Sequence, residues 1–223
     1  MFARWRFERA LRGLAELDEP VLRRYALAAW PNADLPVIEA PLLALDFELD
    51  GLKRDAHILQ AGWLPFNACS IPLELAQVAD VHCAAKLDRR AVTIHGIGED
   101  RAVAGQALHE VILPLIASLS GRILVAHGAD VETAALQGAC RKLFEITLPV
   151  RAICTLKLER HLAPSLVGNG VYRLGAARAR YGLPEYRVHD ALGDAIASAE
   201  LLLAQLATMP ADTRLGRLEA LSR

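Results

Sequence analysis

Three segments of the sequence place carboxylates and histidines where they could act together on a metal ion. In the first, Asp46 and Glu48 stand two residues apart, directly after the apolar run 42–45. On a strand, side chains two residues apart point to the same face, so these carboxylates would lie side by side. Neighbouring carboxylates repel each other, and burying them costs much free energy unless a cation neutralises them. The segment fits a metal site and, taken alone, also fits a solvated strand end.

The second segment carries two acidic residues, Asp130 and Glu132, after an apolar strand at 122–126 and the small-residue turn 127–129. Ligands bind outside the carboxyl ends of strands in α/β folds, so this turn could line a site. Each acid also has a structural interpretation: Asp130 would cap the following helix, and Glu132 would be favourable in its first turn. The two positions differ by about 200° around a helix, so both cannot face one site.

The third segment holds His189 and Asp194 around the start of a helix expected at 191–206. A histidine with a near-neutral pKa suits proton transfer, and a carboxylate one turn into the helix can face the same side of a cleft. A structural histidine and a solvated helix residue would give the same short pattern.

The rest of the chain predicts the elements that must position these segments. Short apolar runs indicate strands at 42–45, 57–66, 70–78, 122–126 and 150–155. Amphipathic patterns indicate helices at 3–17, 20–30, 102–120, 130–144, 174–181 and 191–206, with a last short helix past Asp212. A β-meander followed by alternating helices and strands predicts an α/β fold, with a mixed sheet flanked by helices.

The order of the three segments resembles the DEDDh branch of the DnaQ-like exonuclease superfamily, which includes the proofreading epsilon subunit of bacterial replicative polymerase. The motif D-x-E-T-T-G-L of this family stands here as DFELDGL (46–52), and H-N-A-x-F-D-x-x-F-L stands as HGADVETAAL (127–136). The third motif, H-x-A-L-x-D-A, reads HDALGDA (189–195), and VTIHGI (92–97) is similar to a V-H-G-I element between the first two. The resemblance covers about residues 41–207.

This resemblance implies an RNase H-like, five-stranded mixed sheet and a metal-dependent 3′→5′ exonuclease acting on single-stranded DNA or RNA. It implies four ligands for two divalent cations, Mg²⁺ or Mn²⁺: Asp46, Glu48, Glu132 and Asp194. It makes His189 the general base, which accepts the proton of the attacking water. It assigns contacts with the terminal nucleotide to Leu49, Leu52 and His127.

Several positions depart from the family pattern. The Thr-Thr pair is replaced by Leu49-Asp50, the asparagine of the second motif by Gly128, and its aspartate by the longer Glu132. Asp130 is the rival ligand, although it stands two positions early in register. Two alternatives therefore stay open: a nucleic-acid-binding module with weakened catalysis, or a hydrolase of nucleotides or short oligonucleotides on the same fold.

Composition limits the other possibilities. The 223 residues carry 25 Lys+Arg against 26 Asp+Glu, so bulk positive charge would not drive nucleic-acid binding. The absence of a targeting signal and of a long charge-free apolar run predicts a cytoplasmic protein without membrane contact, and the four cysteines are expected as free thiols. The expected division is a helical extension (1–40), the exonuclease domain (41–208) and a helical tail (209–223). The aromatic-rich extension should pack on this domain, on a second copy in a homodimer, or on a partner protein.

Overall fold

The core of the protein is one mixed sheet of five strands. The computed structural model describes residues 2–51, 56–168 and 170–222. Its strands are β1 (Leu42–Leu49), β2 (Ile58–Phe66), β3 (Gln77–Asp80), β4 (Ile123–Ala126) and β5 (Ala152–Cys154), in the order β3-β2-β1-β4-β5. Strand β1 pairs antiparallel with β2 and parallel with β4; β2–β3 is antiparallel and β4–β5 parallel. The predicted RNase H-like mixed sheet is therefore confirmed.

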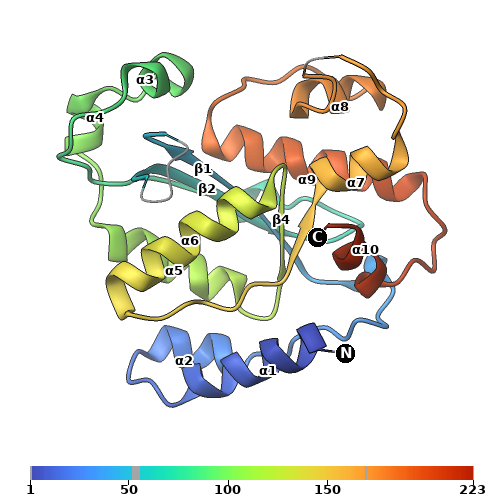
Figure 1. Ribbon diagram of the computed structural model, residues 1–223, viewed down its shortest axis with the longest axis horizontal. Helices are drawn as coiled ribbons and strands as arrows, with labels where there is room; N and C mark the ends of the chain where they lie inside the picture. Colours follow the sequence, from blue (N-terminus) through green and yellow to red (C-terminus); the bar gives the residue numbers. More distant parts are fainter. Residues whose placement is uncertain (1, 52–55, 169, 223) are drawn as a thin grey trace.

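Helices cover both faces of this sheet (Figure 1). One face packs against α5 (Leu108–Leu119) and α6 (Ala129–Phe144), and the other against α9 (Ala191–Ala207) with α7 (Thr155–Leu162) and α10 (Leu215–Leu221). The remaining helices are α1 (Phe2–Ala15), α2 (Pro20–Leu27), α3 (Arg89–His95), α4 (Glu99–Val103) and α8 (Leu174–Arg180), with short 3-10 turns at Val37–Glu39 and Leu73–Leu75.

The alternation of side chains along β1 decides which face receives the carboxylates. Leu43, Leu45 and Phe47 are buried in the core that includes α5 and α6, whereas Leu42 and Ala44 are buried in the core that includes α9. Because side chains two residues apart share a face, the side chains of Asp46 and Glu48 continue the row of Leu42 and Ala44. The strand runs to Leu49 rather than ending at residue 45, so both acids belong to the strand itself.

The helix predicted at 102–120 is wrong in its bounds. The chain forms α4 and α5 instead, and the break lies at Gly105, where an added Cβ would come within 2.5 Å of the Val81 carbonyl carbon. There Gln106 forms a parallel β-bridge with Val81, the residue that directly follows β3. Tertiary pairing thus overrides the helical pattern of the sequence.

Other predicted bounds also differ. The strand predicted at 70–78 is a 3-10 turn followed by β3, consistent with the restriction that Pro72 places on extended pairing. Helices α3 and α7 were not predicted, because both are short and follow directly on irregular or strand-like segments.

The N-terminal helices pack on the rest of the chain, below α5 in Figure 1. Tyr25 of α2 is fully buried, and its hydroxyl donates to the Pro149 carbonyl at 2.6 Å. The ring of Trp30 meets those of Phe7 and Tyr25 edge-on, each at 4.9 Å between centroids. This confirms that the segment packs on the sheet domain, one of the predicted arrangements.

Two further expectations concern the cysteines and membrane-spanning segments. All four cysteines are free, and three of them are buried. Among the described residues, no helix combines the length and apolar character needed to cross a membrane.

We expect α2 to contribute strongly to stability. Leu22 is fully buried on α2, whereas Leu27 on the same helix is 71% exposed. Leu22→Ala should lower the free energy of unfolding by about 2–5 kcal/mol, through lost burial and the cavity left behind. Leu27→Ala is the matched control and should change it by less than about 0.5 kcal/mol. Urea denaturation measures both; equal effects would show that α2 does not pack as described.

Candidate active site

The first turn of α9 packs directly on β2, next to the two acids of the neighbouring strand β1. Asp46 pairs across the sheet with Gly62, and Glu48 pairs with Gln60. A Cβ at Gly62 would stand 2.2 Å from the Leu192 amide nitrogen, so only glycine permits this approach. The missing side chain at Gly62 therefore lets the helix that carries Asp194 reach the face of Asp46 and Glu48.

Hydrogen bonds fix this helix start in place. Asp190 caps α9, with its carboxylate accepting from the Gly193 amide at 2.9 Å. The buried Gln60 accepts from the Ala191 amide at 3.1 Å and donates to Asp80 at 2.8 Å. Asp80 also forms a two-pronged ion pair with Arg101 of α4, both contacts being 2.7 Å. The first turn of α9 is thereby tied to β2, β3 and α4.

Asp194 accepts a hydrogen bond on each of its carboxylate oxygens. The Tyr186 hydroxyl donates to Oδ1 at 2.6 Å, and the His189 amide donates to Oδ2 at 2.9 Å. His189 has a left-handed backbone conformation (φ 61°), which is uncommon for a residue other than glycine. One potential ligand atom each from Glu48, His189 and Asp194 lies within 4.8 Å of the other two. The histidine and the carboxylates thus share one side of the site, as the third segment predicted.

The two acids of α6 point to different environments. Glu132 is 5% exposed and lies close enough to Asp46 to raise the pKa of that carboxyl. Asp130 is exposed and pairs with Lys157 at 2.8 Å. The expected capping role of Asp130 is wrong: Gly128 is the N-cap of α6, with a left-handed φ of 116°, and no side chain caps it. The helix simply begins one residue earlier than the sequence suggested.

Burial raises the pKa of all four carboxylates, and neighbouring acids add to each shift. Burial, followed by the charges of Glu132, Asp194 and Glu48, raises the pKa of Asp46 well above its usual range. Burial together with Asp194 and Asp190 raises the pKa of Glu48 to about 7. Burial, Asp130 and Asp194 raise the pKa of Glu132 to about 8. Burial also raises the pKa of Asp194, although the hydrogen bonds from Tyr186 and the His189 amide oppose this shift.

These residues fit a site for divalent cations. Oδ and Oε atoms are the hard oxygen ligands that Mg²⁺ and Mn²⁺ prefer. Oε2 of Glu132 is buried and has no hydrogen-bond partner in the described part of the chain. Such an atom costs free energy unless something binds it, and a cation among the four carboxylates would satisfy it and neutralise their repulsion.

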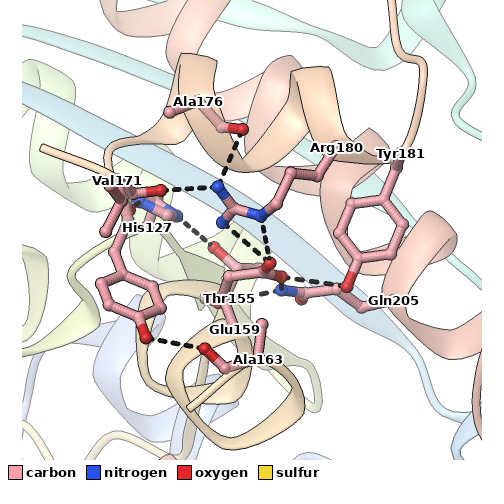
Figure 2. A network of polar contacts seen from close by, with 10 residues as sticks. His127, Thr155, Glu159, Ala163, Val171, Ala176, Arg180, Tyr181 and Gln205 are labelled. Atoms are coloured by element: carbon pink, nitrogen blue, oxygen red, sulfur yellow. Dashed lines mark hydrogen bonds and ion pairs between the residues drawn. The ribbon is translucent and has the colours of Figure 1, made fainter. Parts of the chain in front are cut away.

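A polar network supports the turn that precedes α6 (Figure 2). Both ring nitrogens of His127 have partners within the chain: Nδ1 lies 2.9 Å from Thr155 Oγ1, and Nε2 lies 2.8 Å from the Tyr172 carbonyl. Burial lowers the pKa of His127, which favours the neutral form of the ring. Its substrate-binding role stays a prediction, and the contacts present here are structural.

The same network contains a buried carboxylate that is not part of the site. Glu159 accepts from Arg180 at 2.8 Å, from Tyr181 at 3.0 Å and from Gln205 at 2.8 Å, which joins α7, α8 and α9 (Figure 2). Arg178 is likewise buried and bonded to Glu200. Arg178 and Arg180 are thus each paired with a carboxylate within the chain, outside the cluster of four acids.

The remaining predicted contacts lie at the end of β1. Leu49 is half-buried after a register shift in the β1–β2 ladder, and Leu52 lies outside the described residues. The segment 92–97 contains the last residues of α3 and its C-cap Gly96. Its His95 is buried, and burial together with the neighbouring charges of His189 and Arg101 lowers the pKa of this histidine.

Sequence reasoning missed Gln60, Gly62 and Tyr186. A glutamine and a glycine inside the apolar run 58–66 were a visible signal, because both interrupt a buried strand. No spacing pattern marked Tyr186, which reaches Asp194 from an irregular segment.

The sequence is similar to part of two known bacterial polymerases. The chain is 26% identical over 191 residues to the DNA polymerase III PolC-type of Thermotoga petrophila, and the match covers 83% of this chain but only 13% of that protein. The corresponding protein of Thermotoga maritima matches with the same identity and coverage.

Solved structures share the fold. Exonuclease X in complex with 5′ overhanging duplex DNA superposes with a TM-score of 0.66 and 22% identity, covering 82% of this chain and 99% of that one. The nuclease domain of 3′hExo, a DEDDh family member bound to rAMP, gives a TM-score of 0.62 and 16% identity, covering 75% and 92%. The family model for the RNase_T exonucleases matches residues 43–202, which include all four carboxylates and His189. This chain therefore belongs to the RNase_T exonuclease family, within the DnaQ-like superfamily that its motifs resemble.

Proposed function

We propose that this protein is a metal-dependent 3′→5′ exonuclease that hydrolyses phosphodiester bonds at the 3′ end of single-stranded DNA or RNA. The observation that carries the proposal is the gathering of Glu48, Glu132 and Asp194 close enough to Asp46 to raise its pKa, with one buried oxygen of Glu132 left without a partner in the described chain. An ion pair with a lysine or arginine would explain one such acid, but no positively charged side chain in the described part of the chain is hydrogen-bonded to any of the four. Membership of an exonuclease family supports the same reaction.

The proposed roles follow the geometry. Asp46, Glu48, Glu132 and Asp194 hold two divalent cations, Mg²⁺ or Mn²⁺, which when bound would stabilise charge on the attacking and leaving oxygens. His189 is exposed and close to Glu48 and Asp194, so it can accept the proton of the attacking water. Leu49, Leu52 and His127 remain the proposed contacts for the terminal nucleotide.

The proposal assigns catalysis to residues 41–208. Residues 1–40 and the tail 209–223 would stabilise this unit from outside, and α10 does bury Leu215 and Leu218 against the α9 side of the sheet. A cytoplasmic location and association through the N-terminal helices, in a homodimer or with a partner protein, are further proposals.

An assay on a 5′-labelled single-stranded oligonucleotide tests the reaction. With Mg²⁺ or Mn²⁺ we expect a ladder that shortens from the 3′ end, and EDTA should abolish it. His189→Ala should lower kcat by roughly 10²–10⁴, because the attacking water loses its proton acceptor. Binding without shortening would support the weakened binding module instead. Cleavage restricted to dinucleotides and other short oligonucleotides would support the alternative hydrolase.

The two acids of α6 provide a matched pair of variants. Glu132→Ala should remove most activity, because it deletes a buried oxygen ligand. Asp130→Ala should retain activity and cost at most about 1 kcal/mol of stability, because its ion pair with Lys157 is largely exposed. Steady-state kinetics on both variants decides: an inactive Asp130→Ala beside an active Glu132→Ala would require a site built around Asp130.

Stability of the metal-free protein should depend on pH with a defined sign. Glu48 and Glu132 keep their protons up to pKa values of about 7 and about 8 when folded, whereas unfolded glutamate releases its proton near about 4.3. The folded state thus binds more protons between these values. The stability that these two groups contribute is therefore fully present at low pH and is lost as pH rises through about 7 to about 8.

Melting temperatures with and without Mn²⁺ check this expectation. In EDTA, the melting temperature should fall between about pH 5 and pH 8, and saturating Mn²⁺ should reverse most of the fall at the upper end. Asp46→Asn should raise the metal-free melting temperature at pH 8, and Asp130→Asn is its control at an exposed position. A wild-type melting temperature insensitive to Mn²⁺ would contradict the cation site.

A further inference from the structure

Tyr186 occupies a place in this site that neither the motifs nor the family match assigns. It lies between α8 and α9, and its hydroxyl donates to Oδ1 of Asp194 at 2.6 Å, a length typical of a hydrogen bond to a charged oxygen. The His189 amide holds the other oxygen of the same carboxylate. We propose that Tyr186 is a positioning residue that holds Asp194 in the orientation required to bind a divalent cation.

The side chain of Arg178 packs against the face of the Tyr186 ring and restrains it. The guanidinium carbon lies 4.8 Å from the ring centroid, which is cation–π distance. Arg178 is 2% exposed, and it donates to the Ala197 carbonyl at 2.9 Å and to Pro184 at 3.0 Å, with Glu200 as its ion-pair partner at 2.6 Å. The ring is therefore fixed to α8 and α9 by a buried side chain whose own hydrogen bonds leave it little freedom.

Repulsion explains why Asp194 needs such a restraint. Its carboxylate lies close enough to Asp46 and Glu48 to contribute to the raised pKa of each. A short aspartate side chain on a helix first turn could relieve this repulsion by rotating towards solvent. The phenol donor opposes that rotation before any cation binds. Each carboxylate oxygen retains another lone pair, so the hydrogen bond does not compete with a bound cation.

A purely structural role for Tyr186 makes a different prediction. If the ring only fills space beneath α9, removal of the hydroxyl would leave the affinity for metal unchanged. Tyr186→Phe separates the two roles, because it keeps the ring and the contact with Arg178. Tyr181→Phe is the matched control: the Tyr181 hydroxyl also donates to a carboxylate, that of Glu159 at 3.0 Å, outside the carboxylate cluster.

The inference rests on the proposed function, so its test includes a measurement without turnover. Calorimetric titration with Mn²⁺ should show a Kd about 10-fold weaker in Tyr186→Phe than in wild type, as expected for loss of a partner that orients a ligand. Tyr181→Phe should bind like wild type. In the exonuclease assay, the Mg²⁺ concentration for half-maximal rate should rise about 10-fold in Tyr186→Phe, and saturating Mg²⁺ should restore most of the rate.

A double-mutant cycle keeps the test decisive if the tyrosine variant is less stable. In an Asp194→Ala background, Tyr186→Phe should weaken Mn²⁺ binding no further, because its target is gone. Equal weakening in both backgrounds, or wild-type affinity in Tyr186→Phe, would overturn the inference. A wild type that binds Mn²⁺ without exonuclease activity, combined with weaker binding in Tyr186→Phe, would refute the proposed function and leave the role of Tyr186 standing.

Discussion

The close approach of α9 to β2 at Gly62 is the constraint on which the site depends. Any side chain at this position would collide with the backbone of Ala191 and Leu192, and α9 would have to move away from the sheet. Asp194 lies in the first turn of that helix, so displacement of α9 would separate it from Asp46 and Glu48. A glycine in a buried strand has an entropic cost and contributes no side-chain packing, which this contact offsets. The site therefore begins with a missing side chain rather than with a charged one.

Electrostatics then determines what this arrangement can hold. Glu132 and Asp194 lie in the first turns of α6 and α9, where the helix dipole favours negative charge. Asp46 and Glu48 lie on a strand and have no such support. Burial raises the pKa of Asp46 well above its usual range, and each of the other three acids adds to the shift. The pKa values of Glu132 and Asp194 are raised despite the helix dipoles, so protons or cations on these oxygens lower the free energy of the folded protein.

Local patterns allowed the mixed sheet flanked by helices to be predicted, whereas the set of four carboxylates was implied by the resemblance of three motifs to a known family. Strand alternation placed Asp46 and Glu48 on one face, and helical geometry separated Asp130 from Glu132, whichever of the two served the site. The bounds near Gly105 depend on where distant backbone passes, and the capping role of Asp130 failed because α6 begins at Ala129 after the N-cap Gly128. Gln60, Gly62 and Tyr186 escaped prediction likewise, since their importance lies in contacts with α9 that no short motif records.

These contacts divide the residues around Asp194 into two groups with separate tasks. Gln60 acts on the backbone of α9: it accepts from the Ala191 amide and connects through Asp80 to Arg101 of α4. Tyr186 acts on the carboxylate alone, with Arg178 behind it. The first group sets where the helix begins, and the second sets which way one side chain on it points. Four repelling acids require both, because a correctly placed helix still leaves Asp194 free to rotate away, and a correctly oriented carboxylate is of no use on a displaced helix.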